Sequence, residues 1–204
     1  LDQINRTNVT RLKTAWTYHA GDISDGTKYF IRSAFEATPL VIDGVMYFTT
    51  PFCRLIALEA ETGKELWTFD PRLDKDRRYM LFSTRGASYW SNGKDKRLFV
   101  GTLDGRLFAV DAATGKPVPS FGNDGWINMR QGVADEYPES TYALTSPVAV
   151  YRNLLITGAF TSDGDPQGPS GDVRAFDART GKLVWRFHVV PRKGEFGNAT
   201  WEGD

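Results

Sequence analysis

The chain has 204 residues, 41% of them hydrophobic and 13% aromatic, which is enough to bury a substantial core. Basic and acidic residues number 25 each, and this balance, without a basic stripe among the aromatics, argues against a nucleic-acid partner. The single cysteine, Cys53, rules out an internal disulfide framework, and no run of about 18 apolar residues is present that would span a membrane. The first residue is not Met and the last ones stop in mid-pattern, so we expect a piece of a longer protein.

The predicted elements are strands throughout, because no segment has a convincing helical periodicity. Residues 12–18 read as one isolated strand ahead of three sets of four strands. The first set comprises residues 38–42, 45–48, 54–58 and 64–69, with Asp43-Gly44 as a two-residue hairpin turn. The second comprises residues 86–90, 97–100 and 106–110 and a weaker strand near Val118. The third comprises residues 146–150, 154–156, 172–176 and 183–187.

One short sequence recurs between the third and fourth strands of each set. The pattern Ala-x-Asp/Glu-x-x-Thr-Gly-Lys begins at Ala57, Ala109 and Ala175. These starts are 52 and then 66 residues apart, a spacing typical of propeller blades with insertions. Trp67 and Trp185 occupy equivalent places in their fourth strands, where we expect them to wedge between neighbouring blades, whereas the second copy has no such tryptophan.

The repeats therefore predict an all-β fold, a partial β-propeller of about three four-stranded blades within a single domain that covers the whole chain. We place the blades near residues 36–70, 85–121 and 145–188. Residues 1–22 are expected to supply an outer strand that closes the last blade, and residues 196–204 to start the next one.

Four residues are predicted to meet at one mouth of the propeller axis. Glu36, Arg85 and Thr145 precede the innermost strands of the three blades, and Asp163 lies in the long loop between the second and third strands of the third blade. A guanidinium, a hydroxyl and carboxylates together suit a small polyanionic ligand with a hard cation such as Ca²⁺. Taken singly, each residue also fits an ordinary surface or turn position.

The three repeat segments resemble the tryptophan-docking repeat of the quinoprotein dehydrogenases, eight-bladed propellers that oxidise alcohols or sugars with pyrroloquinoline quinone (PQQ). The resemblance extends over essentially the whole chain. Segments similar to the family occur in the family's order: the opening through Gly21-Asp22, Thr38-Pro39-Leu40-Val41, Arg85-Gly86 with Tyr89-Trp90, and the closing residues 200–204.

This resemblance implies functions for single residues. Glu36 is similar to the glutamate that borders the quinone, Arg85 to the arginine that faces it, and Thr145 to the threonine at the cofactor's carboxylate region. Asp163 falls where the family places an acidic Ca²⁺ ligand. The family's catalytic aspartate would lie beyond residue 204, so no catalytic residue is expected in this chain, and the isolated chain is expected to be inactive. An alcohol or sugar substrate, a quinone or cytochrome c as electron acceptor and a periplasmic location are also implied.

The chain departs from the family at the expected wall over the quinone. Tyr79-Met80 stand where methanol dehydrogenases have two adjacent cysteines, and Leu81 stands where membrane-bound glucose dehydrogenases have a histidine nearby. We expect Tyr79, Met80 or Phe82 to form this wall instead. The sequence of residues 171–188 resembles the glucose-dehydrogenase branch of the family more closely than the methanol-dehydrogenase branch.

Two other functions also fit the sequence. A non-catalytic propeller that serves as a scaffold or interaction protein explains the turns and tryptophans equally well, but it does not predict four functional groups at one mouth. A sugar-binding or sensing domain needs exposed aromatic side chains at that mouth, and Tyr79, Phe82 and Phe160 are candidates for them.

Overall fold

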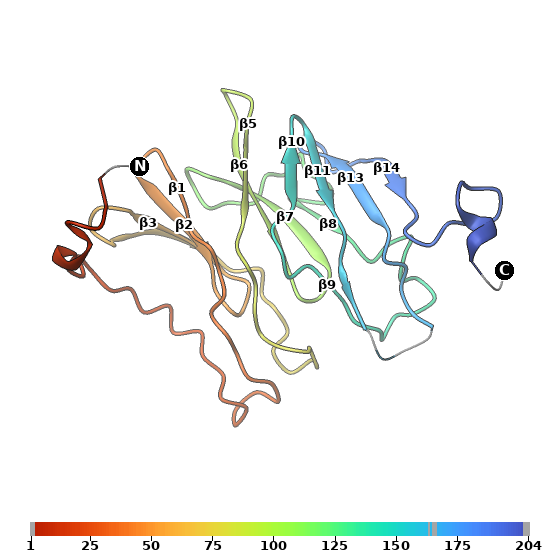
Figure 1. Ribbon diagram of the computed structural model, residues 1–204, viewed down its shortest axis with the longest axis horizontal. Coiled ribbons are helices and arrows are strands. Elements are labelled where there is room, and N and C mark those ends of the chain that lie inside the picture. Colours follow the sequence, from red (N-terminus) through yellow and green to blue (C-terminus); the bar gives the residue numbers. More distant parts are fainter. Residues whose placement is uncertain (1–2, 163, 165–166, 202–204) are drawn as a thin grey trace.

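The computed structural model describes residues 3–162, 164 and 167–201 and contains three four-stranded antiparallel sheets arranged in a row, with the chain termini at opposite ends (Figure 1). The first blade consists of β1 (Leu40–Ile42), β2 (Val45–Thr49), β3 (Leu55–Glu59) and β4 (Glu65–Phe69). The second consists of β5 (Ser88–Ser91), β6 (Lys96–Gly101), β7 (Arg106–Asp111) and β8 (Trp126–Asn128). The third consists of β10 (Ala149–Tyr151), β11 (Leu154–Thr157), β13 (Val173–Asp177) and β14 (Leu183–Phe187). The predicted all-β partial propeller is confirmed.

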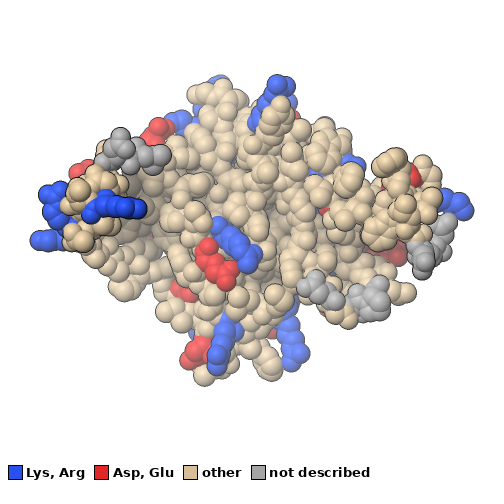
Figure 2. Space-filling model, in the orientation of Figure 1, with Lys and Arg blue, Asp and Glu red and all other residues tan. Residues whose placement is uncertain are grey.

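The helical content of the described residues is limited to two short 3₁₀ turns, η1 (Val9–Arg11) and η2 (Asn198–Thr200). No helix in this part of the chain is long and apolar enough to cross a membrane. On the face of the molecule in Figure 2, basic and acidic side chains lie scattered among a larger uncharged surface.

The hairpin at Asp43-Gly44 has the backbone that its sequence predicts. Asp43 has a φ of 50° and Gly44 a φ of 78°, so both central residues are left-handed, as a type I′ turn requires. This turn fixes the pairing of β1 with β2, in which Ile42 lies opposite Val45 and Leu40 opposite Tyr47.

The fourth strand of the second blade is not where the sequence predicts it. Pro117 forms an isolated bridge with Val110 of β7, and the Val118 N–H donates to the carbonyl oxygen of Ala109 at 2.9 Å. The chain then turns away, and β8 begins only at Trp126, opposite Phe108. Pro119 has no backbone N–H to donate, and the pairing with β7 is interrupted after Val118. The second blade therefore extends beyond the predicted limit at residue 121.

A two-stranded sheet lies beside the third blade and was not predicted. It pairs β9 (Tyr142–Ala143) with β12 (Phe160–Thr161) in antiparallel fashion. Each strand has only two residues, too few to show an alternating pattern. The sheet ties the start of the long loop after β11 to the segment that precedes β10.

Tryptophans dock on the repeat glycines of neighbouring segments. A Cβ atom added to Gly115 would lie 2.6 Å from the ring of Trp67, and one added to Gly63 would lie 2.5 Å from the ring of Trp16. The predicted wedge of Trp67 between the first two blades is confirmed. In the third blade, Ile127 and Phe121 of the second blade contact Gly181 instead, because the second blade lacks the tryptophan.

The amino-terminal segment does not form the predicted strand. Residues 12–18 run along the first blade without strand pairing, and Trp16 Nε1 donates a hydrogen bond of 3.1 Å to the carbonyl oxygen of Ala60. Tyr18 packs edge-on against Phe48. That this segment closes the last blade remains a prediction.

Candidate functional site

The segments that lead into the three blades are joined by backbone hydrogen bonds. The Thr38 N–H donates to the carbonyl oxygen of Arg85 at 3.1 Å, and the Arg85 N–H donates to the carbonyl oxygen of Thr145 at 2.8 Å. Because each of these residues precedes the innermost strand of its blade, the ladder holds three blades in a fixed register at one edge of the molecule.

Gly86 allows this close approach. Its φ is 128°, and an added Cβ would lie 2.9 Å from the carbonyl oxygen of Thr38. A side chain at this position would strain the backbone and push the first blade away from Arg85.

The ladder brings the side chains of Glu36, Arg85 and Thr145 together. The guanidinium of Arg85 lies 3.4 Å from the Glu36 carboxylate and donates a hydrogen bond of 3.4 Å to the Thr145 hydroxyl. The structure brings these three of the four predicted residues together, and their binding of a cofactor stays a prediction. Their side chains remain 54% exposed at Arg85 and 38% exposed at Glu36, so the ion pair is loose and the guanidinium stays accessible to a ligand.

The three residues line a cleft of about 170 Å³. The remaining lining residues are mainly apolar: Tyr79, Met80, Leu81, Ser83, Leu103, Thr141, Ala143 and Phe160. Ala143 and Phe160 come from the two-stranded sheet, which places the loop after β11 against the cleft. Asp163, the predicted metal ligand, lies outside the described residues. The described part of the chain holds no group of three or more His, Cys, Asp or Glu residues suited to a metal ion.

The segment before Arg85 shows which side chains form the wall. Tyr79, Leu81 and Ser83 line the cleft at every second position, as expected of an extended chain, and exposed Met80 lines its rim. Phe82 points the other way: it is fully buried and packs edge-on against Phe52. Phe82 therefore does not form the wall over the quinone, because its side chain lies on the opposite side of the segment. For the same reason it is not an exposed aromatic residue of a sugar-binding site.

Two buried hydroxyls of the wall have no hydrogen-bond partner among the described residues. They are Tyr79 Oη and Ser83 Oγ. Burial raises the pKa of the Tyr79 hydroxyl above its usual range, and the negative charge of Asp104 raises it further. Buried hydroxyls normally find a partner because desolvating them otherwise costs free energy. Tyr79 and Ser83 both line the cleft, so their hydroxyls are candidates for a ligand's hydrogen bonds.

The comparisons with known proteins place this geometry in a family. The sequence profile described as "PQQ: Glucose/ethanol/alcohol dehydrogenase, beta-propeller domain" matches residues 1–204. The chain belongs to this family. Glu36, Arg85 and Thr145 thus form a cleft in a propeller of the PQQ dehydrogenases.

Two curated relatives and one solved structure illustrate the similarity to the PQQ dehydrogenase family. The chain is 43% identical over 195 residues to the dehydrogenase subunit of the quinone alcohol dehydrogenase of Acetobacter aceti, covering 94% of the chain and 23% of the relative. It is 34% identical over 206 residues to quinoprotein glucose dehydrogenase A of Acinetobacter calcoaceticus, covering 92% and 26%. The crystal structure of quinohemoprotein alcohol dehydrogenase from Comamonas testosteroni superposes with a TM-score of 0.74 at 32% identity, covering 94% and 25%.

Two points follow from these comparisons. The chain spans about a quarter of the length of the relatives that it matches. The identity to the alcohol dehydrogenase subunit exceeds the identity to the glucose dehydrogenase, so the similarity of residues 171–188 to the glucose branch gains no support.

Sequence reasoning missed Ser83, Leu103, Thr141 and Ala143 as lining residues. A signal for Ser83 was present, because it lies two residues before Arg85 in an extended segment and so shares its side. The other three reach the cleft through the unpredicted sheet and the β6–β7 turn, for which the sequence offers no comparable pattern.

Proposed function

We propose that the chain supplies the first three blades of a quinoprotein dehydrogenase that oxidises an alcohol or an aldose. The observation that carries the proposal is the cluster of Arg85, Glu36 and Thr145 in one cleft of a PQQ-family propeller. A non-catalytic scaffold would need the docked tryptophans but not this cluster.

In this proposal PQQ, when bound, supplies a quinone that accepts a hydride, and Ca²⁺ polarises the quinone oxygen. Arg85, which lines the cleft, would hold the cofactor through charge-assisted hydrogen bonds and would offset negative charge on its reduced form. Thr145 and Glu36, which both lie within 3.4 Å of the guanidinium, would orient the cofactor. Asp163 would hold the metal, and a residue beyond this chain would take the substrate proton.

The test is reconstitution of the full-length protein with PQQ and Ca²⁺. We expect a change in cofactor absorbance and reduction of an artificial dye with alcohols or aldoses. Arg85→Ala removes a charge-assisted contact, so it should weaken PQQ binding by about tenfold or more. Arg152→Ala, which removes an exposed arginine on the β10–β11 turn, is the matched control and should leave binding unchanged. Equal affinities for the two variants, or no absorbance change with wild type, would contradict the proposal.

We further propose a periplasmic location and a quinone or cytochrome c as electron acceptor. Support comes from the family alone, in which the Acetobacter relative is named as a quinone alcohol dehydrogenase. Cell fractionation, and reduction assays with each purified acceptor, would distinguish these possibilities.

A further inference from the structure

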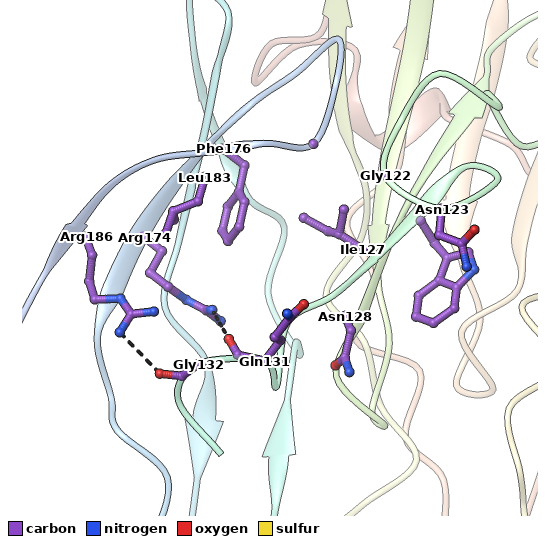
Figure 3. Close-up of a pocket in the computed structure, with 12 residues that line it drawn as sticks. Gly122, Asn123, Ile127, Asn128, Gln131, Gly132, Arg174, Phe176, Leu183 and Arg186 are labelled. Atoms are coloured by element: carbon purple, nitrogen blue, oxygen red, sulfur yellow. Dashed lines mark hydrogen bonds between the residues drawn. The ribbon is translucent and has the colours of Figure 1, made fainter. Parts of the chain in front are cut away.

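A second cleft, of about 630 Å³, lies between the second and third blades (Figure 3). One wall comes from β8 and the loops around it, and the other from β13 and β14. Its lining residues are Gly122, Asn123, Trp126, Ile127, Asn128, Gln131, Gly132, Arg174, Phe176, Gly181, Leu183 and Arg186. The cleft opens where the second blade lacks its docking tryptophan, and elements of two complete blades bound it.

Two arginine side chains lie side by side on the wall formed by β13 and β14. Arg174 and Arg186 are directly opposite in the antiparallel ladder, an arrangement in which like charges destabilise a sheet. Asp172 is the one carboxylate of the described chain within ion-pair distance of Arg186, at 3.7 Å. Arg174 forms no ion pair among the described residues, and the cleft has no acidic lining residue, so this end carries excess positive charge.

The two arginines differ in burial and in their hydrogen-bond partners. Arg174 is only 2% exposed and donates to the carbonyl oxygen of Gln131 at 3.1 Å and to the Tyr142 hydroxyl at 2.7 Å, while its Nε lacks a partner among the described residues. Arg186 donates to the carbonyl oxygen of Gly132 at 3.2 Å, and its side chain is 23% exposed. Arg174 therefore contributes buried charge, and Arg186 contributes a donor that a ligand can reach.

Apolar side chains lie beside this charge. Phe176 and Leu183 are paired across the same two strands, and Ile127 faces them from the opposite wall (Figure 3). The amide side chains of Asn128 and Gln131 lie near the guanidinium end. A cleft of this size, with apolar walls and a few convergent polar groups, has the ordinary properties of a small-molecule site.

We propose that this cleft binds a small carboxylate with an apolar, ring-sized body. Arg186 donates hydrogen bonds to the carboxylate, and the buried Arg174 stabilises the negative charge of the carboxylate. The apolar body packs against Leu183, Phe176 and Ile127. The site is separate from the cleft at Arg85 and does not depend on the proposed dehydrogenase function.

The test is a calorimetric titration of the full-length protein with 1-naphthoate. We expect saturable binding that Arg186→Gln weakens by about tenfold or more, because a charge-assisted hydrogen bond is lost. Arg152→Gln makes the same charge change on an exposed turn and should bind like wild type. The neutral analogue 1-naphthamide should bind at least tenfold more weakly than 1-naphthoate.

A second pair of variants tests the apolar wall and does not disturb the arginines. Leu183→Ala should weaken 1-naphthoate binding several-fold, because it removes apolar contact area. Val184→Ala changes an equally exposed neighbour that does not line the cleft and should have no effect. The absence of 1-naphthoate binding, equal binding of the amide, or equal effects within either variant pair would overturn the proposal. If Arg186→Gln does not fold, the difference in 1-naphthoate binding between Leu183→Ala and Val184→Ala decides whether the proposal holds.

Discussion

The glycines of the first two repeat turns determine how closely a tryptophan can pack on each turn. Gly115 has a φ of 70°, and an added Cβ would lie 2.6 Å from the Trp67 ring. We expect Gly115→Ala to lower the free energy of unfolding by about 2–5 kcal/mol, since it combines left-handed strain of about 1–2 kcal/mol with overpacking of about 1–3 kcal/mol. Urea denaturation of the full-length protein measures the change.

Gly44 provides the matched control. Its φ is 78°, but an added Cβ would meet no atom within 4 Å, so Gly44→Ala introduces strain without overpacking. Its cost should stay at about 1–2 kcal/mol. If the two variants lose the same stability, the contact of Trp67 with Gly115 does not matter to the packing of the blades.

Cys53 illustrates how burial controls reactivity. The side chain is fully buried, and burial raises the pKa of its thiol from 9.0 to about 12. We expect no alkylation by iodoacetamide in the native protein at pH 8 and rapid alkylation in urea, as measured by mass spectrometry. Because the folded-state pKa is raised, the stability that this thiol contributes is complete below pH 9.0 and is lost as the pH rises toward 12. Fast native alkylation would contradict this assignment.

At the residue scale, sequence reasoning located the charged part of the cleft but only some of its wall. Glu36, Arg85 and Thr145 were predictable because each precedes an innermost strand, so one repeated topology places all three. Phe82 was misassigned because its hydrophobicity was considered without the two-residue alternation of the extended chain. Asp163, the predicted metal ligand, remains a prediction.

At the element scale, one arginine joins the second and third blades. Arg97 of β6 is buried and donates to the carbonyl oxygens of Ala178 at 3.1 Å and Arg179 at 2.7 Å in the repeat turn of the third blade. We expect Arg97→Met to destabilise the protein by about 2–4 kcal/mol, because these carbonyls lose a charged donor. Urea denaturation measures the loss.

The neighbouring residue is the control for this prediction. Lys96 is exposed and pairs only with the exposed Asp43, so Lys96→Met should leave the denaturation midpoint nearly unchanged. Equal shifts for Lys96→Met and Arg97→Met would show that the contact between the blades contributes nothing measurable.

Strands that show a full apolar run bounded by turn residues were predictable from the sequence. Strands that form only because the fold brings a pairing segment to them were not. β2, β3 and β14 follow clear apolar runs with turn residues between them. β8 was misplaced because the repeat motif pointed to Val118, where the pairing with β7 begins but is interrupted at Pro119. The pair β9 and β12 exists only because the fold brings two short segments together.

At the scale of the whole molecule, the third blade presents an uncovered apolar side. Trp185 and Phe187 of β14 are both exposed, and Trp185, the equivalent of the docked Trp67, contacts no repeat glycine within the described chain. We expect the isolated 204-residue chain to self-associate and to show no dye reduction with PQQ and Ca²⁺. Light scattering and a turnover assay measure these properties.

Trp185→Lys should reduce this self-association, because it places a charge on the uncovered side. Tyr151→Lys, at an exposed aromatic residue on β10, serves as the comparison and should have a smaller effect. A monomeric wild-type chain, or measurable turnover, would show that three blades are sufficient on their own.

The hydrogen bonds that link Thr38, Arg85 and Thr145 have a consequence for how such a protein can change over time. A single-residue insertion ahead of any one of these strands would turn that strand's leading side chain to the opposite side and remove it from the cleft. The distal hairpin turn at Gly93, by contrast, adjoins open space and can lengthen without moving Arg85. Length variation among natural variants should therefore accumulate at the outward turns, and the three leading segments should keep a constant residue count.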